Sequence, residues 1–221
     1  MLPELLFQHN NYTVMHYLVR EGRGDIFDLD APYQRGAVWT EQQQRNLIKS
    51  LYMGLPVGAV VISTLGSRAT VPYRVVDGKQ RILAVRTFIA GQLAVPADWF
   101  RPGDLADQDN YEQPDVMVRW DDLSPAGQGQ FDMRSLPAIE FNGRTEYIRV
   151  AGRYQHRDRT DSEILQAEAE LFLLINFAGV AQTDQDRSRA QAIASTPAGE
   201  SQDDLDGLAK FAAHLPIDGL E

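Results

Sequence analysis

Five consecutive residues combine an acid, a glycine and two cations in a pattern that suits phosphate binding. Residues 77–81 read Asp-Gly-Lys-Gln-Arg, after a β-like run over residues 71–76 and before a helix-like run over residues 82–90. The first amides of a helix have no intrahelical acceptor, and the helix dipole adds partial positive charge there. A phosphate at this position would meet several N–H donors, with further charge from Lys79 and Arg81 and an amide from Gln80.

The acid, the glycine and the arginine each suit a role in such a site. Gly78 suits a turn with positive φ or a close approach of the backbone to a ligand, and Asp77 suits a metal ligand or a base. Helical spacing places Arg81 on the face of Val85 and Phe88, so we expect its guanidinium to point inward and to require an anion. Asp-Gly turns at helix starts are also common, so the pentapeptide alone leaves a purely structural reading open.

A second group of polar and aromatic residues precedes another expected helix. Arg35 offers a bidentate fork for phosphate oxygens, next to the amide of Gln34. Tyr33 and Trp39 could stack on a base, although core packing is the favoured interpretation for both rings. Gln44 shares a helix face with apolar residues, which fits a first turn that faces either a ligand or solvent.

The elements that must position these residues alternate between strands and helices. Periodicity and capping residues predict helices over residues 13–21, 40–53, 79–90, 161–176 and 183–194. Runs of β-branched and apolar residues predict strands over 26–29, 57–63, 70–76 and 136–141, the last followed by an Asn142-Gly143 hairpin turn and a return strand over 147–150.

One domain is expected over residues 1–195, followed by an acidic, partly ordered tail over 196–221. Residues 92–130 are rich in Pro, Gly, Asp and Gln, and we interpret them as an insertion or a mobile lid. Short helical turns are expected near 97–100 and 124–131 within it.

Composition excludes several classes of protein. A chain of 221 residues with 43% hydrophobic composition can bury one substantial core. No apolar run is long enough to span a membrane, and the N-terminus lacks the pattern of a secretory signal. Cysteine is absent, which removes disulfides, thiolate metal sites and cysteine nucleophiles, and fits a reducing compartment. We therefore expect a cytoplasmic protein.

The formal charge of −10 argues against a protein whose whole surface embraces nucleic acid. One local cluster could still meet a polyanion such as modified DNA, because its arginines face only Glu146 and Asp158. A solvated, charged hairpin is the favoured alternative for this cluster. Its members are Arg144, Arg149, Arg153, Arg157 and Arg159.

The two polar groups stand in an order that resembles a known family. Residues 32–36 read Pro-Tyr-Gln-Arg-Gly, Trp39 follows, residues 54–58 read Gly-Leu-Pro-Val-Gly, and residues 77–81 complete the series. Together with an Ile-Asn segment at 175–176, these motifs resemble the N-terminal domain family of GmrSD-type restriction proteins, in the ParB/sulfiredoxin-like superfamily, over roughly residues 10–190. The family's second motif is usually Asp-Gly-Gln-Gln-Arg, and Lys79 replaces its first glutamine here.

The resemblance implies a fold and an activity. The expected fold is a mixed α/β domain, a small mixed sheet flanked by helices with a helical C-terminal part. The expected activity is binding of a nucleoside triphosphate with Mg²⁺ or Mn²⁺, followed by its hydrolysis, in a DNA restriction or modification context. Arg35, Lys79 and Arg81 would then hold phosphates and Asp77 would hold the metal or act as a base. Sulfiredoxin chemistry is excluded because its essential cysteine is missing.

Two alternatives remain open at this point. The same site could transfer phosphate to a hydroxyl on a protein or a modified DNA base, as a kinase does. The chain could instead be a non-catalytic nucleotide sensor or specificity subunit that acts with a separate nuclease. We expect no nuclease domain in this chain, because its histidines are scattered without metal-ligand spacing at positions 9, 16, 156 and 214.

Overall fold

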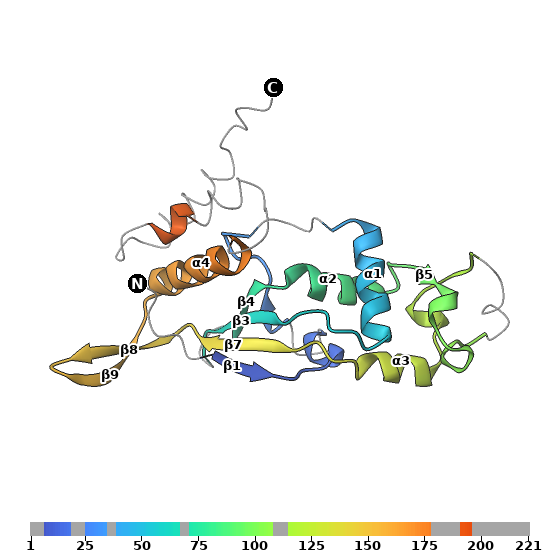
Figure 1. Cartoon of the computed structure of the whole chain (residues 1–221), viewed down its shortest axis with the longest axis horizontal. Coiled ribbons are helices and arrows are strands. Elements are labelled where there is room, and N and C mark those ends of the chain that lie inside the picture. The colour runs from blue at the N-terminus through green and yellow to red at the C-terminus, as the bar shows by residue number, and fades with distance from the viewer. Residues whose placement is uncertain are drawn as a thin grey trace, which may run out of the picture.

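A five-stranded mixed sheet forms the centre of the protein, in the strand order β1-β7-β3-β4-β2 (Figure 1). The computed structural model describes residues 7–18, 25–34, 39–66, 71–107, 115–177 and 191–195. The strands of the sheet are β1 (Phe7–Asn10), β2 (Phe27–Asp28), β3 (Val60–Thr64), β4 (Tyr73–Asp77) and β7 (Ala138–Asn142). β3 runs parallel to β7 and antiparallel to β4, while β2 runs parallel to β4. The expectation of a mixed α/β fold is confirmed.

Helices α1 (Glu41–Tyr52) and α2 (Lys79–Ile89) cover one face of this sheet. Their apolar side chains, among them Ile48 and Phe88, pack against Val60, Ile62 and Val75 in one buried cluster. Because successive strand residues point to opposite faces, Val75 and Asp77 lie on the side of α1 and α2. α1 begins with a capping box between Thr40 and Gln43, in agreement with the predicted cap.

The opposite face of the sheet is covered by α4 (Asp161–Phe177). Leu165 and Phe172 of this helix pack against Val61, Val76 and Phe141. The helix predicted over residues 161–176 is thus confirmed. Of the helix predicted over 183–194, only residues 191–194 are described, and they are helical. The predicted tail over 196–221 lies outside the described residues.

The segment over residues 92–130, interpreted as an insertion or lid, packs its described part into the same core as α1 and α2. It contains the short strands β5 (Val95–Pro96) and β6 (Met117–Val118), which pair with each other. It also contains the turns η2 (Ala97–Trp99), η3 (Pro102–Asp104) and η5 (Trp120–Asp122), and it leads into α3 (Pro125–Asp132). Val95, Phe100, Val118 and Phe131 are buried in the α1/α2 cluster. The division into domains stays a prediction.

Two local predictions were wrong. The helix expected over residues 13–21 is only one 3-10 turn, η1 (Val14–Tyr17), and the chain is already extended at Leu18. Thr13 makes no side-chain cap that would propagate this turn. The second error is the hairpin expected at Asn142-Gly143. β7 pairs with β1 and β3, whereas β8 (Thr145–Val150) pairs with β9 (Arg153–Asp158).

Long-range pairing explains the second error. β7 finds partners on both sides within the central sheet, so the strand that follows it has to pair elsewhere. The β8–β9 turn consists of Ala151 and Gly152, both with positive φ, which matches the twist of a two-residue hairpin. In the part of the chain that the structure describes, no helix has the length and apolar character needed to cross a bilayer.

The packing of α3 yields a stability prediction. A Cβ at Gly127 would lie 2.3 Å from the carbonyl oxygen of Asp104, whereas a Cβ at Gly129 would meet nothing within 4 Å. We expect Gly127→Ala to lower the free energy of unfolding by about 1–3 kcal/mol through overpacking. Gly129→Ala should raise it by about 0.5–1 kcal/mol, because alanine is the better helix former.

Urea unfolding of the two variants would measure both changes. The two substituted positions lie two residues apart in one helix and differ in the space around the added methyl group. Equal effects of the two substitutions would show that η3 does not pack closely against α3 at Gly127.

Candidate functional site

The turn between β4 and α2 holds the first polar motif. Asp77 is the last residue of β4, Gly78 adopts φ 95° and ψ 8°, and Lys79 begins α2. The positive φ predicted for Gly78 is confirmed. A Cβ at this position would also lie 2.8 Å from Nη1 of Arg81 and 3.1 Å from Cα of Val60. Glycine therefore allows β3, the turn and the Arg81 side chain to pack together.

Arg81 points inward, as its helical spacing predicted. Its Nη1 donates to the carbonyl oxygen of Ala59 at 3.0 Å, and both Nη atoms lie 3.4 Å from Oδ2 of Asp77. The anion beside Arg81 is thus the carboxylate of its own motif. At 3.4 Å, with the two side chains 22% and 24% exposed, this is a loose ion pair of small energetic value.

Lys79 also has an acidic partner, which the sequence did not suggest. Its Nζ lies 2.8 Å from Oδ1 of Asp30, in the segment that follows β2. The Lys79 side chain is only 11% exposed, whereas the Asp30 side chain is 91% exposed. The lysine is therefore held in place by the fold, and its partner is a surface carboxylate that another anion can replace at little cost.

Glutamine side chains connect the two motifs. Nε2 of Gln34 donates to the carbonyl oxygens of Val75 and Val76 at 2.8 and 2.6 Å, so the turn before α1 is attached to the end of β4. Oε1 of Gln80 accepts from the backbone N–H of Trp39 at 3.3 Å. The structure thus brings residues of both motifs together where β4 ends and α2 begins.

For two further residues near the second motif, the structure places Gln44 but does not describe Arg35. Gln44 is half-buried, and its Nε2 donates to the carbonyl oxygen of Trp39 at 3.4 Å, so its polar position on α1 is used by the chain itself. Arg35, predicted to bind phosphate, lies outside the described residues.

The position of Tyr33 does not fit the predicted contact with a ligand. Its side chain is completely buried, with its ring centroid 5.5 Å from that of Phe172 on α4. The hydroxyl group donates to Oε2 of Glu168 at 3.4 Å. A ring without exposed surface cannot stack on a base, so Tyr33 anchors the turn that carries Gln34. Core packing, the interpretation favoured for this ring, is confirmed.

Glu168 is a buried acid that the sequence reasoning missed. It has no exposed surface, and its Oε2 accepts from Nη1 of Arg74 at 3.1 Å, while Nε of Arg74 donates to Asp28 at 2.8 Å. Burial raises the pKa of Glu168, and the facing Arg74 guanidinium opposes that rise. Its spacing offered a signal, because residue 168 lies four residues from both Ile164 and Phe172 on the buried face of a helix.

The chemistry of these groups suits a phosphate ester with a bound divalent cation. In the described residues, no three His, Cys, Asp or Glu side chains are grouped to hold a metal. Mg²⁺ usually takes one or two carboxylates and completes its shell with phosphate oxygens and water, so Asp77 could serve as such a ligand. Oε1 of Gln34 is buried and has no hydrogen-bond partner among the described residues. As an acceptor, it suits a hydroxyl group, an amine or a metal-bound water.

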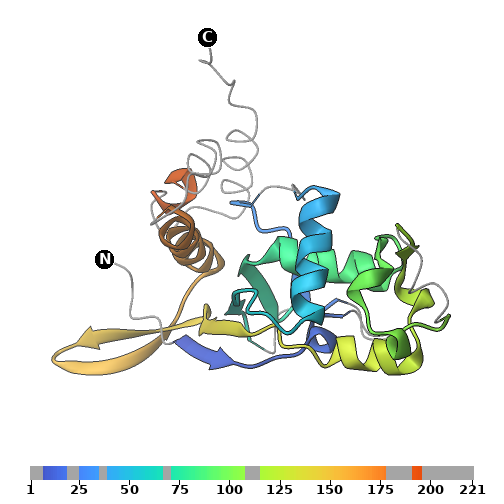
Figure 2. The same ribbon diagram turned by 45° about the vertical axis from the view of Figure 1, so that its right-hand side comes forward.

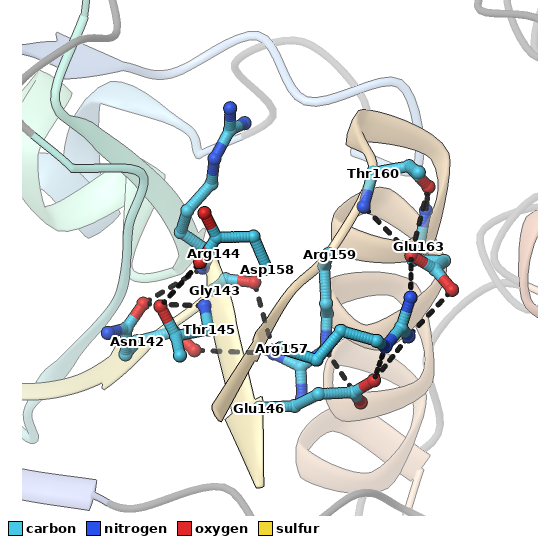
Figure 3. A network of polar contacts seen from close by, with 10 residues as sticks. All are labelled: Asn142, Gly143, Arg144, Thr145, Glu146, Arg157, Asp158, Arg159, Thr160 and Glu163. Carbon is cyan, nitrogen blue, oxygen red and sulfur yellow. Dashed lines mark hydrogen bonds and ion pairs between the residues drawn. The ribbon is translucent and has the colours of Figure 1, made fainter. Parts of the chain in front are cut away.

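The predicted arginine cluster is not a uniform basic patch. Figure 3 shows Arg157 between Glu146 and Glu163, with hydrogen bonds to both carboxylates. Arg159 is 3% exposed and donates to the carbonyl oxygen of Gly143 at 3.0 Å. Arg144 pairs with Asp161 at 2.9 Å. These three arginines stabilise the base of the β8–β9 hairpin and are engaged with the protein itself.

Comparison with known proteins identifies one family. The family described as GmrSD restriction endonuclease, N-terminal domain, matches residues 17–196. No curated protein and no solved structure matches the chain.

The hairpin base generates a pH prediction. Hydrogen bonds from Arg157 lower the pKa of Glu163 to about 2, from an ordinary value of 4.5. A carboxylate with a lowered folded pKa stabilises the fold above its unfolded pKa and loses this contribution as the pH falls through the folded value. We expect Glu163→Gln to flatten the decrease in unfolding free energy between about pH 4.5 and about pH 2, measured by urea titration. Parallel pH profiles for the two proteins would contradict the ion pair.

A matched glycine pair tests the packing of the β4–α2 turn. Gly66 and Gly78 have φ angles of 85° and 95°, but a Cβ at Gly66 would meet nothing within 4 Å. Alanine at either position should cost about 1–2 kcal/mol of backbone strain. Gly78→Ala should cost a further ~1–3 kcal/mol because it displaces Arg81 and presses on Val60. Equal midpoints of urea unfolding for the two variants would refute the close packing at Gly78.

Proposed function

Because the chain belongs to the GmrSD restriction endonuclease N-terminal domain family, we propose that this domain binds a nucleoside triphosphate at the β4–α2 turn and hydrolyses it within a restriction system. One observation carries the proposal. Arg81 pairs with Asp77 and Lys79 pairs with Asp30 where β4 ends, Gln34 is attached to the same end of β4, and both cations have partners that an anion can replace.

The charges of the site favour a polyphosphate. A triphosphate that approaches the start of α2 meets the first helical amides, which have no intrahelical acceptor. Lys79 can exchange the surface carboxylate of Asp30 for a phosphate oxygen without leaving its position. Arg81 can turn the Nη2 donor that faces the loosely held Asp77 to phosphate while Nη1 keeps its bond to Ala59.

Asp77 and a polyphosphate are both negative, and this repulsion is the reason to expect a divalent cation between them. Mg²⁺ or Mn²⁺ would supply positive charge to the phosphate oxygens when bound. Asp77 then either holds this ion or accepts the proton of the attacking water. Gln34 offers its Oε1, which has no partner among the described residues, to a hydroxyl, an amine or a metal-bound water. Its amide N–H groups keep the turn attached to β4.

The decisive experiment follows the γ-phosphate. Purified protein is incubated with each γ-labelled nucleoside triphosphate and Mg²⁺ or Mn²⁺, with and without DNA that carries modified bases. Release of free phosphate supports hydrolysis. Label on DNA or protein would show a kinase instead, and nucleotide binding without either product would show a sensor or specificity subunit that acts with a separate nuclease.

Substitutions at the turn give a quantitative expectation. We expect Asp77→Ala and Arg81→Ala each to lower kcat by about 100-fold or more, because each removes charge that acts on the transferred phosphoryl group. Arg101→Ala removes an exposed arginine outside the turn and should keep wild-type kcat. Circular dichroism and urea unfolding would establish that the variants are folded. Wild-type kcat in both site variants would place the reaction elsewhere.

A further inference from the structure

The β8–β9 hairpin is a ribbon that leaves the body of the protein. Its strands pair with each other from Thr145 and Asp158 at the base to Val150 and Arg153 at the tip. Figures 1 and 2 show from two directions that the ribbon extends beyond the end of the central sheet. Among the described strands, β8 and β9 pair only with each other, so both edges of the ribbon are unpaired.

Charge divides this ribbon into two parts. The base contains the acids Glu146 and Asp158, and both are engaged: Glu146 binds two arginines, and Asp158 accepts from the hydroxyl of Thr145 at 3.3 Å. The distal part, residues 147–156, contains Arg149, Arg153 and His156 and no acidic residue at all. In a chain of net charge −10, the outermost part of this projection is therefore positively charged.

The base network also fixes the direction of the ribbon. Arg157 connects β9 to β8 through Glu146 and to α4 through Glu163, and Arg159 donates to the carbonyl oxygens of Asn142 and Gly143 (Figure 3). Glu163 also accepts from the backbone N–H of Thr160 at 2.8 Å, where α4 begins. A ribbon held at its base by charged hydrogen bonds presents its tip in a defined position.

We infer that the distal part of the β8–β9 ribbon enters a groove of duplex DNA and contacts its phosphates. The major groove admits a two-stranded β-ribbon, and several DNA-binding folds read it in this way. Arg153, Gln155 and His156 are exposed, which suits contacts to phosphates and base edges. The distal part, which has no acidic residue, would enter the groove, and the rest of the negatively charged protein would stay outside it.

A second copy of the chain is the competing partner for such an arm. Stable protein interfaces have a buried apolar centre. In the distal part, Val150 is the one described large hydrophobic side chain that is strongly exposed. The positive charge of the distal part suits the closely spaced phosphates of DNA, which carry one negative charge about every 1.7 Å of helix axis. The inference builds on the proposed restriction function, but DNA contact by the ribbon does not require nucleotide turnover.

The test measures DNA affinity by fluorescence anisotropy, with a labelled duplex about two helical turns long. The duplex is used in unmodified and base-modified forms, over a series of salt concentrations. For Arg149→Ala/Arg153→Ala, we expect affinity to fall about tenfold, and the slope of log K against log salt to flatten by about 1 for each lost phosphate contact. The matched control Arg101→Ala/Arg119→Ala removes two exposed arginines outside the hairpin and its base, and it should keep wild-type affinity.

A deletion variant provides a second measurement. Residues 147–156 are replaced by Asn-Gly, which closes the shortened hairpin with a two-residue turn. None of the described residues in this range belongs to a core cluster, so the variant should fold with an unchanged urea midpoint and lose DNA binding.

The outcomes separate the two proposals. Wild-type DNA affinity in the arm variants, an equal loss in the control, or no DNA binding by the wild-type protein would overturn the role of the ribbon. An arm-dependent dimer in sedimentation analysis, without DNA binding, would assign the ribbon to a second copy. Release of γ-phosphate without DNA is measured separately, and its absence would count against the proposed hydrolysis alone.

Discussion

Gln34 uses one amide group to join two stretches of chain that are 41 residues apart in the sequence. Its Nε2 donates to successive carbonyl oxygens of β4, at Val75 and Val76, immediately before the turn that carries Asp77. These two bonds fix the distance between the turn before α1 and the start of α2. The cations of α2 and the amide of Gln34 are therefore held in place by the fold itself. For the proposed nucleotide, such preorganisation would lower the entropic cost of binding.

The opposite face of the sheet supports the same turn. Tyr33 precedes Gln34 in the chain and extends to Glu168 of α4, and Glu168 in turn binds Arg74 of β4. Beside this pair, α4 contacts the sheet through an apolar cluster that includes Leu165, Phe172, Val61 and Val76. A buried ion pair contributes little net stability compared with apolar packing, but it tolerates few alternative geometries. In this protein it sets how α4 docks against β4, and through Tyr33 it also positions the Gln34 turn.

Features that depend on residues close together in the sequence could be predicted from it. The positive φ of Gly78, the inward direction of Arg81 and the helix that follows rest on neighbouring residues, and the structure has them as expected. Features that depend on distant partners could not be predicted in the same way. The hairpin expected after β7 does not form, because β7 pairs with β1 on one side and with β3 on the other. The partners of Lys79, Tyr33 and Glu168 also come from other elements, so no local pattern reveals them.

The Arg74–Glu168 pair restricts the order in which this sequence can change over evolutionary time. Loss of Arg74 alone would leave the fully buried carboxylate of Glu168 without its cation. Such a change costs about 3–5 kcal/mol in buried pairs. Replacement of Glu168 by a neutral residue first is the less damaging step, because Arg74 keeps Asp28 as a second acidic partner. Accepted substitutions at these two positions should therefore be correlated and should follow a preferred direction. Among divergent relatives, a neutral residue at position 168 beside a retained arginine at position 74 would be the expected intermediate.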